Sequence, residues 1–116
     1  MYHSCILYMM TVYSSDDSCE WDSEKDILNR SKHGLSFETA SKVFCDPWFV
    51  EIPDDIHSTL EEEHFQGFGT INGIAIVTIF YSERCSDGKL RHRLISARRL
   101  DSLEKKAYEN YLQAYR

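Results

Sequence analysis

The stretch that decides the fold is HFQGFGTINGIAIVTIFYSER, residues 64–84. Its side chains follow a period of two on both sides of Asn72-Gly73, a dipeptide that is the strongest short signal for a two-residue hairpin turn. CSDGK, residues 85–89, predicts a second turn, and LRHRLISAR, residues 90–98, predicts a third strand. The sequence therefore predicts a three-stranded antiparallel meander.

Helices and one further strand are predicted before the meander. SEKDILNRSKH, residues 23–33, follows Asp22 as an N-cap, has acidic residues in its first turn and basic ones in its last, and ends at Gly34. FETASKVF, residues 37–44, has its apolar positions on one helical face. WFVEI, residues 48–52, is apolar and rich in β-formers, which predicts a strand.

A last helix is predicted after the meander, capped by Asp101 or Ser102. Its apolar stripe should lie against the sheet and consists of Leu103, Ala107, Tyr108, Tyr111, Leu112 and Tyr115. The order of elements predicts an α+β fold. We expect a small, mainly antiparallel sheet with two N-terminal helices and one C-terminal helix packed on it.

The charge of the chain is unevenly distributed. The 116 residues have a net charge of −6, and their number suits a single domain. Residues 1–83 contain 4 Lys or Arg against 15 Asp or Glu, whereas residues 84–116 contain 9 against 4. This asymmetry indicates an anion site or a basic face for an acidic partner. An acidic half that simply pairs with the basic half is the alternative.

The cysteines and the apolar segments bear on location. The four cysteines have no metal-ligand spacing, so we expect free thiols in a reducing cytosol and no metal or cofactor. No apolar stretch is long enough to span a membrane, and CILYMMTVY, residues 5–13, lacks the basic start and cleavage site of a signal peptide. The predicted location is cytoplasmic.

Three stretches together resemble the BrnT family, toxins of bacterial type II toxin–antitoxin systems with a RelE-like fold. They are EWDSEKDILNRSKHGLSFETASKVFCDP, EIPDD followed by EEEHFQGFGTINGIAIVTIFYSER, and RLISARRLDSLEKKAYENY. The resemblance makes residues 19–116 a single toxin domain. Residues 1–18 are then an N-terminal extension, either an extra strand or disordered.

The resemblance also implies a function and a partner. It implies metal-independent RNA cleavage that inhibits translation, and neutralisation by a BrnA-like antitoxin with a ribbon-helix-helix domain. The toxin would then reach DNA only through the antitoxin and would not bind membranes. Both a homodimer and a heterotetramer with the antitoxin stay open.

Arginines carry the chemistry that such a reaction needs, because a guanidinium binds phosphate oxygens bidentately and stays charged. Arg93 and Arg98 match the arginines of the R-x-I-S-A-R motif, and we expect them to bind the phosphate or the transition state. Arg84 matches another family arginine, and Ser96 could hydrogen-bond RNA. Surface salt bridges are the alternative for the arginines, and simple exposure to water is the alternative for the serine.

Proton transfer has several candidates. Lys32 and His33 could supply a cation and a proton-transfer group, or simply stabilise a helix C-terminus. Glu63 is a candidate general base, or one of a solvated run of glutamates. His64 occupies a position where the resemblance implies arginine, so we expect it to bind the substrate as a titratable group in place of a permanent charge, or to weaken catalysis. His57 has no predicted partner.

A non-catalytic interaction module is the competing interpretation. In that case the basic face docks an acidic partner, and the nuclease has decayed. The acidic pI of about 5.3, the departure at His64 and the extra N-terminal residues favour it.

Overall fold

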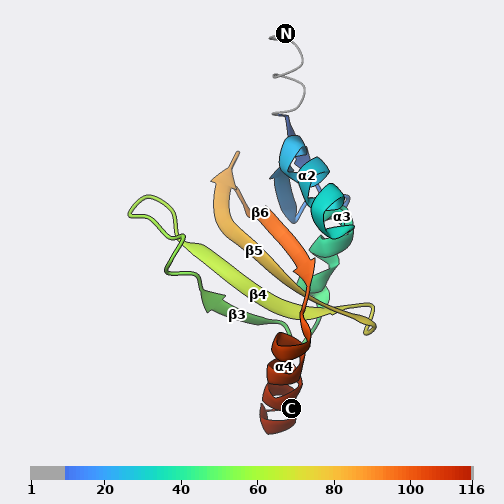
Figure 1. The fold of residues 1–116 in the computed structure, drawn as a ribbon. Coiled ribbons are helices and arrows are strands. Elements are labelled where there is room, and N and C mark those ends of the chain that lie inside the picture. Colours follow the sequence, from blue (N-terminus) through green and yellow to red (C-terminus); the bar gives the residue numbers. More distant parts are fainter. Residues whose placement is uncertain (1–9, 116) are drawn as a thin grey trace.

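A six-stranded sheet forms the centre of the computed structural model, which describes residues 10–115 (Figure 1). The strand order is β1-β2-β6-β5-β4-β3. The strands are β1 (Thr11–Tyr13), β2 (Cys19–Asp22), β3 (Val50–Pro53), β4 (His64–Ile71), β5 (Ala75–Ser86) and β6 (Lys89–Arg99). The predicted meander is confirmed as β4, β5 and β6. Asn72 and Gly73 both have positive φ angles, 54° and 70°, as a type I′ turn requires.

One strand pair is parallel, so the sheet is mixed. β2 runs parallel to β6 and antiparallel to β1. The predicted α+β class is confirmed, whereas the mainly antiparallel character is confirmed only in part. Four residues directly before a helix are too few to show a strand period, which is why β2 has no signal in the sequence. β1 belongs to the predicted N-terminal extension, and the first part of that extension, including most of CILYMMTVY, lies outside the described residues.

The two predicted N-terminal helices are confirmed. α2 (Ser23–His33) begins after Asp22, whose Oδ1 accepts a hydrogen bond from the Glu24 amide at 2.8 Å, and ends at Gly34 with φ 67°. The second predicted helix is α3 (Phe37–Ala40), which tightens into the 3-10 helix η1 (Ser41–Cys45). No helix in the described part of the chain is long and apolar enough to span a bilayer.

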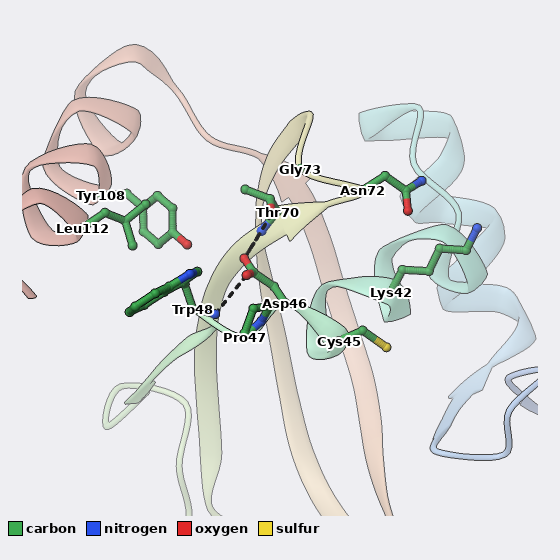
Figure 2. Close-up of a pocket in the computed structure, with 10 residues that line it drawn as sticks. All are labelled: Lys42, Cys45, Asp46, Pro47, Trp48, Thr70, Asn72, Gly73, Tyr108 and Leu112. Carbon is green, nitrogen blue, oxygen red and sulfur yellow. Dashed lines mark hydrogen bonds between the residues drawn. The ribbon is translucent and has the colours of Figure 1, made fainter. Parts of the chain in front are cut away.

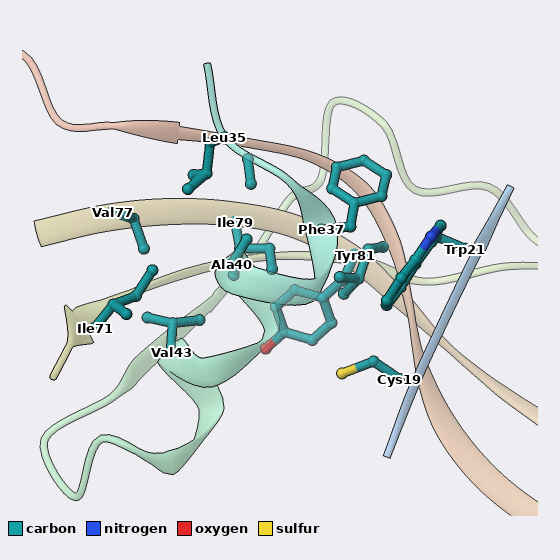
Figure 3. Packing of buried hydrophobic residues seen from close by; sticks show 12 residues of the cluster. Cys19, Trp21, Leu35, Phe37, Ala40, Val43, Ile71, Val77, Ile79 and Tyr81 are labelled. Atoms are coloured by element: carbon teal, nitrogen blue, oxygen red, sulfur yellow. The ribbon is translucent and has the colours of Figure 1, made fainter. Parts of the chain in front are cut away.

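The hydrophobic core lies on one face of the sheet, under α3 and η1 (Figure 3). Phe37 and Val43 are fully buried there against β5 side chains such as Ile79. Asn29 of α2 closes the free edge of β6, because its side-chain amide donates to the Ala97 carbonyl at 2.8 Å and accepts from the Ala97 amide at 3.0 Å. The face opposite α3 and η1 is called the open face below.

The C-terminal helix α4 (Ser102–Tyr115) differs from its prediction. It extends away from the sheet (Figure 1), and of the predicted stripe only Tyr108 is buried, whereas Leu103 is 81% exposed. The helix contacts the open face near its middle, where the Tyr108 ring stacks on Phe68 with the ring centroids 6.5 Å apart. The prediction that the whole stripe packs on the sheet is therefore wrong, because α4 leaves the end of β6 at an angle that carries its later turns beyond the sheet.

Candidate functional site on the open face

The strand register brings four polar side chains into one row across the open face. His64 of β4 pairs with Ser82 of β5, Ser82 pairs with Arg93 of β6, and Arg93 pairs with Glu20 of β2. Residues paired in register share a face, because side chains alternate along each strand. The row joins two residues singled out in the sequence, His64 and Arg93, with two that were not.

A bulge in β6 decides which arginines reach this face. Tyr81 pairs with Leu94 and Phe80 pairs with Ser96, so Ile95 is an extra residue in β6. Strict alternation would place Arg93 and Arg98 on opposite faces. The extra residue reverses the alternation after Leu94, and both arginines therefore lie on the open face. The five-residue spacing of these arginines in R-x-I-S-A-R suits a strand with one bulge.

Two buried polar atoms without a hydrogen bond flank Arg93. Its Nη1 donates to Glu20 Oε2, and the Glu20 side chain is only 4% exposed. The other carboxylate oxygen, Oε1, and the Ser82 hydroxyl are buried and have no hydrogen-bond partner among the described residues. Unsatisfied buried polar atoms are costly, and they are uncommon enough in folded proteins to point to a functional position.

A carboxylate joins an imidazole to a guanidinium at the β4 end of the row. Glu62 Oε1 lies 2.8 Å from Nε2 of His64, and Glu62 Oε2 accepts from Arg84 Nη2 at 3.0 Å. The hydrogen bond from Arg84 lowers the pKa of Glu62, and the contact with His64 acts in the same direction. The group therefore holds a carboxylate, a cation and a proton-transfer side chain within direct contact.

A hollow of about 360 Å³ opens beside this group. Its lining residues come from β4, β5, β6 and the loop before β4, and they are Asp54, His57, His64, Phe80, Ile95 and Ser96. The bulge thus brings Ser96, a predicted RNA contact, to the same hollow as His64. A hollow of this volume accommodates a nucleotide-sized group.

The other predicted site residues lie apart from the hollow. Arg98 shares the open face but binds Glu104 of α4 through two hydrogen bonds, at 2.7 and 3.0 Å, which lower the pKa of Glu104 to about 2. Glu63 is exposed, directly before His64 in the chain, and does not line the hollow. Lys32 and His33 are at the end of α2, directly before the segment that covers the opposite face. Their roles stay predictions.

Four of the residues gathered here carry no signal that the sequence alone makes visible. Ser82 and Glu20 are identified by strand register, which requires knowing that β2 joins β6. His57 and Asp54 lie in an acidic stretch whose composition is typical of a loop. A histidine in such a stretch becomes informative only when the loop is seen to border the hollow.

A larger hollow, about 630 Å³, lies between η1, the β4–β5 turn and α4 (Figure 2). Its floor carries Asp46, whose carboxylate accepts from the Thr70 amide at 2.7 Å and the Trp48 amide at 2.9 Å. These hydrogen bonds join η1 to β4, which gives the Asp46 carboxylate a structural role. None of the four residues of the row on the open face lines this hollow, so its larger volume does not make it the candidate site.

Comparison with known protein families gives a match. A family model described as the ribonuclease toxin BrnT of a type II toxin–antitoxin system matches residues 21–104, most of the chain. No curated protein matches at a significant level. The matched residues include α2, the meander and three of the four residues of the row, His64, Ser82 and Arg93.

Proposed function

Because the chain belongs to the BrnT family of ribonuclease toxins from type II toxin–antitoxin systems, we propose that its open face cleaves RNA without a metal ion or cofactor and thereby inhibits translation. The observation that carries this proposal is Arg93, flanked by the Ser82 hydroxyl and a Glu20 carboxylate oxygen, neither of which has a partner within residues 10–115, in the row that ends at His64. RNA supplies its own nucleophile, the 2′-hydroxyl. The protein then has to bind the phosphate and move two protons.

The proposed roles follow from the contacts. Arg93 stabilises the charge that develops on the phosphate, and the buried Ser82, its register partner on β5, lies beneath that position. Arg84 adds a second positive charge through the group that it forms with Glu62 and His64. His64 exchanges a proton with the substrate, and the exposed Glu63 beside it is an alternative base.

The remaining predicted residues define the reach of the substrate. Ser96 lines the hollow and can hydrogen-bond a base or a ribose. Arg98 extends the positive charge of the open face from Arg93 toward α4. Lys32 and His33 would touch only RNA that passes over the edge of the sheet, so their substitution tests how far the substrate extends.

An antitoxin partner follows from the family, since it is defined within a toxin–antitoxin system. We propose that this partner is BrnA-like, with a ribbon-helix-helix domain that binds DNA for the complex. Co-expression of the chain with such a protein should yield a stable complex and abolish RNA cleavage.

The test is cleavage of a mixed RNA by purified protein in excess EDTA. The informative variant is Arg93→Gln combined with Glu20→Gln, which removes the arginine without leaving its buried carboxylate unpaired. Arg99→Gln is the matched control, because it removes one exposed charge from the same strand outside the row. Cleavage by the wild type and the control, with a loss of about a hundredfold or more in the double variant, supports the proposal.

A non-catalytic docking module is the second candidate. It is favoured by the arginines of β6 that already bind carboxylates of this chain, since an acidic partner would offer the same chemistry. Intact RNA after incubation with folded, antitoxin-free protein, under conditions in which a known ribonuclease is active, would support docking and contradict cleavage.

A further inference from the structure

We propose that His57, held by Asp54, is a second proton-transfer residue that acts across the hollow from His64. The inference rests on the proposed RNA cleavage and extends it. Phosphodiester cleavage by the 2′-hydroxyl needs a base for the attacking oxygen and an acid for the leaving oxygen. The open face offers two imidazoles that border the same hollow, and each of them contacts its own carboxylate.

The His57 imidazole is oriented by a carboxylate. Its Nδ1 lies 2.8 Å from Oδ2 of Asp54, and the Asp54 side chain is only 10% exposed, whereas the imidazole is 66% exposed. A carboxylate that accepts the Nδ1 proton fixes the tautomer of a neutral ring and leaves Nε2 to accept a proton. A largely shielded carboxylate and an accessible imidazole suit a residue that contacts the substrate.

The turn that carries His57 is attached to the backbone of His64. The Asp54 amide donates to the His64 carbonyl at 2.8 Å, and the His64 amide donates to Ser58 Oγ at 2.9 Å. Ser58 Oγ in turn donates to the Asp54 carbonyl at 2.8 Å. Both backbone polar groups of His64 are therefore used to hold this turn. The backbones that carry the two imidazoles are thus held together, and each ring contacts its own carboxylate, as proton transfer to two atoms of one phosphodiester requires.

The reaction balances with these two groups. One imidazole takes the proton of the 2′-hydroxyl while the bond from O2′ to phosphorus forms. The bond from phosphorus to O5′ breaks, and the other imidazole donates its proton to O5′. The products are a 2′,3′-cyclic phosphate and a 5′-hydroxyl, and the enzyme has exchanged one proton between two histidines with no net gain or loss.

The experiment compares two substrates in EDTA. One is ordinary RNA, and the other is uridine 3′-(4-nitrophenyl phosphate), whose leaving group departs without being protonated. We expect both His57→Gln and His64→Gln to reduce RNA cleavage about a hundredfold or more. Only the variant that lacks the general acid should cleave the nitrophenyl ester at a nearly normal rate, because this leaving group needs no proton. Loss of a merely structural residue would lower both activities together.

The role of Asp54 is one of positioning, and it is tested by non-additivity. Asp54→Asn should lower RNA cleavage in the wild type but cause no further loss in His57→Gln, because its only catalytic effect passes through that ring. Asp55→Asn is the matched control, an exposed neighbour of the same type. Thermal unfolding confirms that each variant is folded, and His57→Asn replaces His57→Gln if the latter is not.

The outcomes separate the two proposals. If the wild type cleaves RNA and His57→Gln cleaves it at a rate within about threefold of the wild-type rate, the role of His57 is overturned and the proposed function stands. Equal loss of both substrates in both histidine variants would also overturn it. A folded wild type that cleaves neither substrate would overturn the proposed function and this inference with it.

Discussion

Removing Arg93 should destabilise the protein far more than removing a surface arginine. Its partner Glu20 is 4% exposed and Arg93 itself 20%, so Arg93→Ala leaves a buried carboxylate with neither oxygen paired. Breaking a buried ion pair from one side costs about 3–5 kcal/mol, whereas exposed pairs contribute about 0–1 kcal/mol. Because Arg93 is partly exposed, we expect the lower end, about 3 kcal/mol. At roughly 4 °C per kcal/mol for a domain of this size, the melting temperature should fall by about 12 °C.

Urea unfolding followed by tryptophan fluorescence measures this loss. Trp21 is buried in β2, next to Glu20, and packs edge-on against Phe37 with ring centroids 6.0 Å apart. Its emission should report the loss of the native sheet. The free energy of unfolding of Arg93→Ala, taken from the shift in midpoint, should be about 3 kcal/mol below that of the wild type.

Two further variants decide whether the reasoning is right. Glu20→Gln added to Arg93→Ala removes the stranded charge and should restore more than half of the lost stability. Arg84→Ala is the control, since Arg84 is 47% exposed in its pair with Glu62 and should cost less than about 1 kcal/mol. A loss in Arg93→Ala no larger than in Arg84→Ala, or no recovery with Glu20→Gln, would refute the account of a buried, charge-paired Glu20.

Three other predictions concern stability and reactivity. Asn29→Ala should lower the free energy of unfolding by about 3 kcal/mol, because it leaves the buried amide and carbonyl of Ala97 unpaired. Urea unfolding measures this loss, and a loss under about 1 kcal/mol would contradict the prediction. Arg98→Ala should flatten the pH dependence of the melting temperature. The pKa of Glu104 is about 2 when folded and about 4.3 when unfolded, so the pair stabilises the protein above about pH 5 and this stabilisation is lost as the pH falls toward 2. Because both side chains are partly exposed, the effect should be on the order of 1 kcal/mol, seen as a smaller difference between melting at pH 6 and pH 3 than in the wild type. Burial raises the pKa of Cys19 to about 11, so iodoacetamide should modify this thiol about a hundredfold more slowly than an ordinary thiol until urea unfolds the chain. Peptide mass mapping locates the label, and rapid modification of Cys19 in the folded protein would contradict the prediction.

The elements predicted correctly from the sequence are those specified by neighbouring residues. Asn72-Gly73 adopts the two positive φ angles that its turn needs, and Asp22 and Gly34 begin and end α2 through contacts within one helical turn. Such signals act over a few residues and hold whatever the rest of the chain does. The meander and the first two helices therefore follow from local pattern.

The elements that could not be predicted depend on distant parts of the chain. β2 is a strand because it pairs with β6, about 70 residues later, and nothing within its four residues requires this. The apolar stripe of α4 suggests a helix that packs along its length. How far it packs depends on the direction in which the chain leaves β6, and only Tyr108 is buried.

The candidate site shows the same division. The family resemblance singles out Arg93 and Arg98 as a pair, although strict alternation from the sequence would separate them. Only the bulge at Ile95 places both on the open face. Ser82 and His57 become visible when register and loop contacts are known, because serine and histidine are unremarkable residues in a strand and a loop.

The negative charge of the chain does not prevent phosphate binding, because the β6 arginines are engaged in different ways. Arg98 uses two nitrogens on Glu104, so a phosphate has to displace that carboxylate, which can return to water because it is partly exposed. Glu20 is too deeply buried to be released in this way. Arg93 binds it through Nη1, and its other nitrogens make no hydrogen bond to the described residues. A guanidinium has five N–H groups, so Arg93 can keep its carboxylate and still bind a phosphate oxygen. Glu20 then holds Arg93 in place before the substrate arrives, and of the two arginines Arg93 is the one that can contact phosphate without first breaking an ion pair.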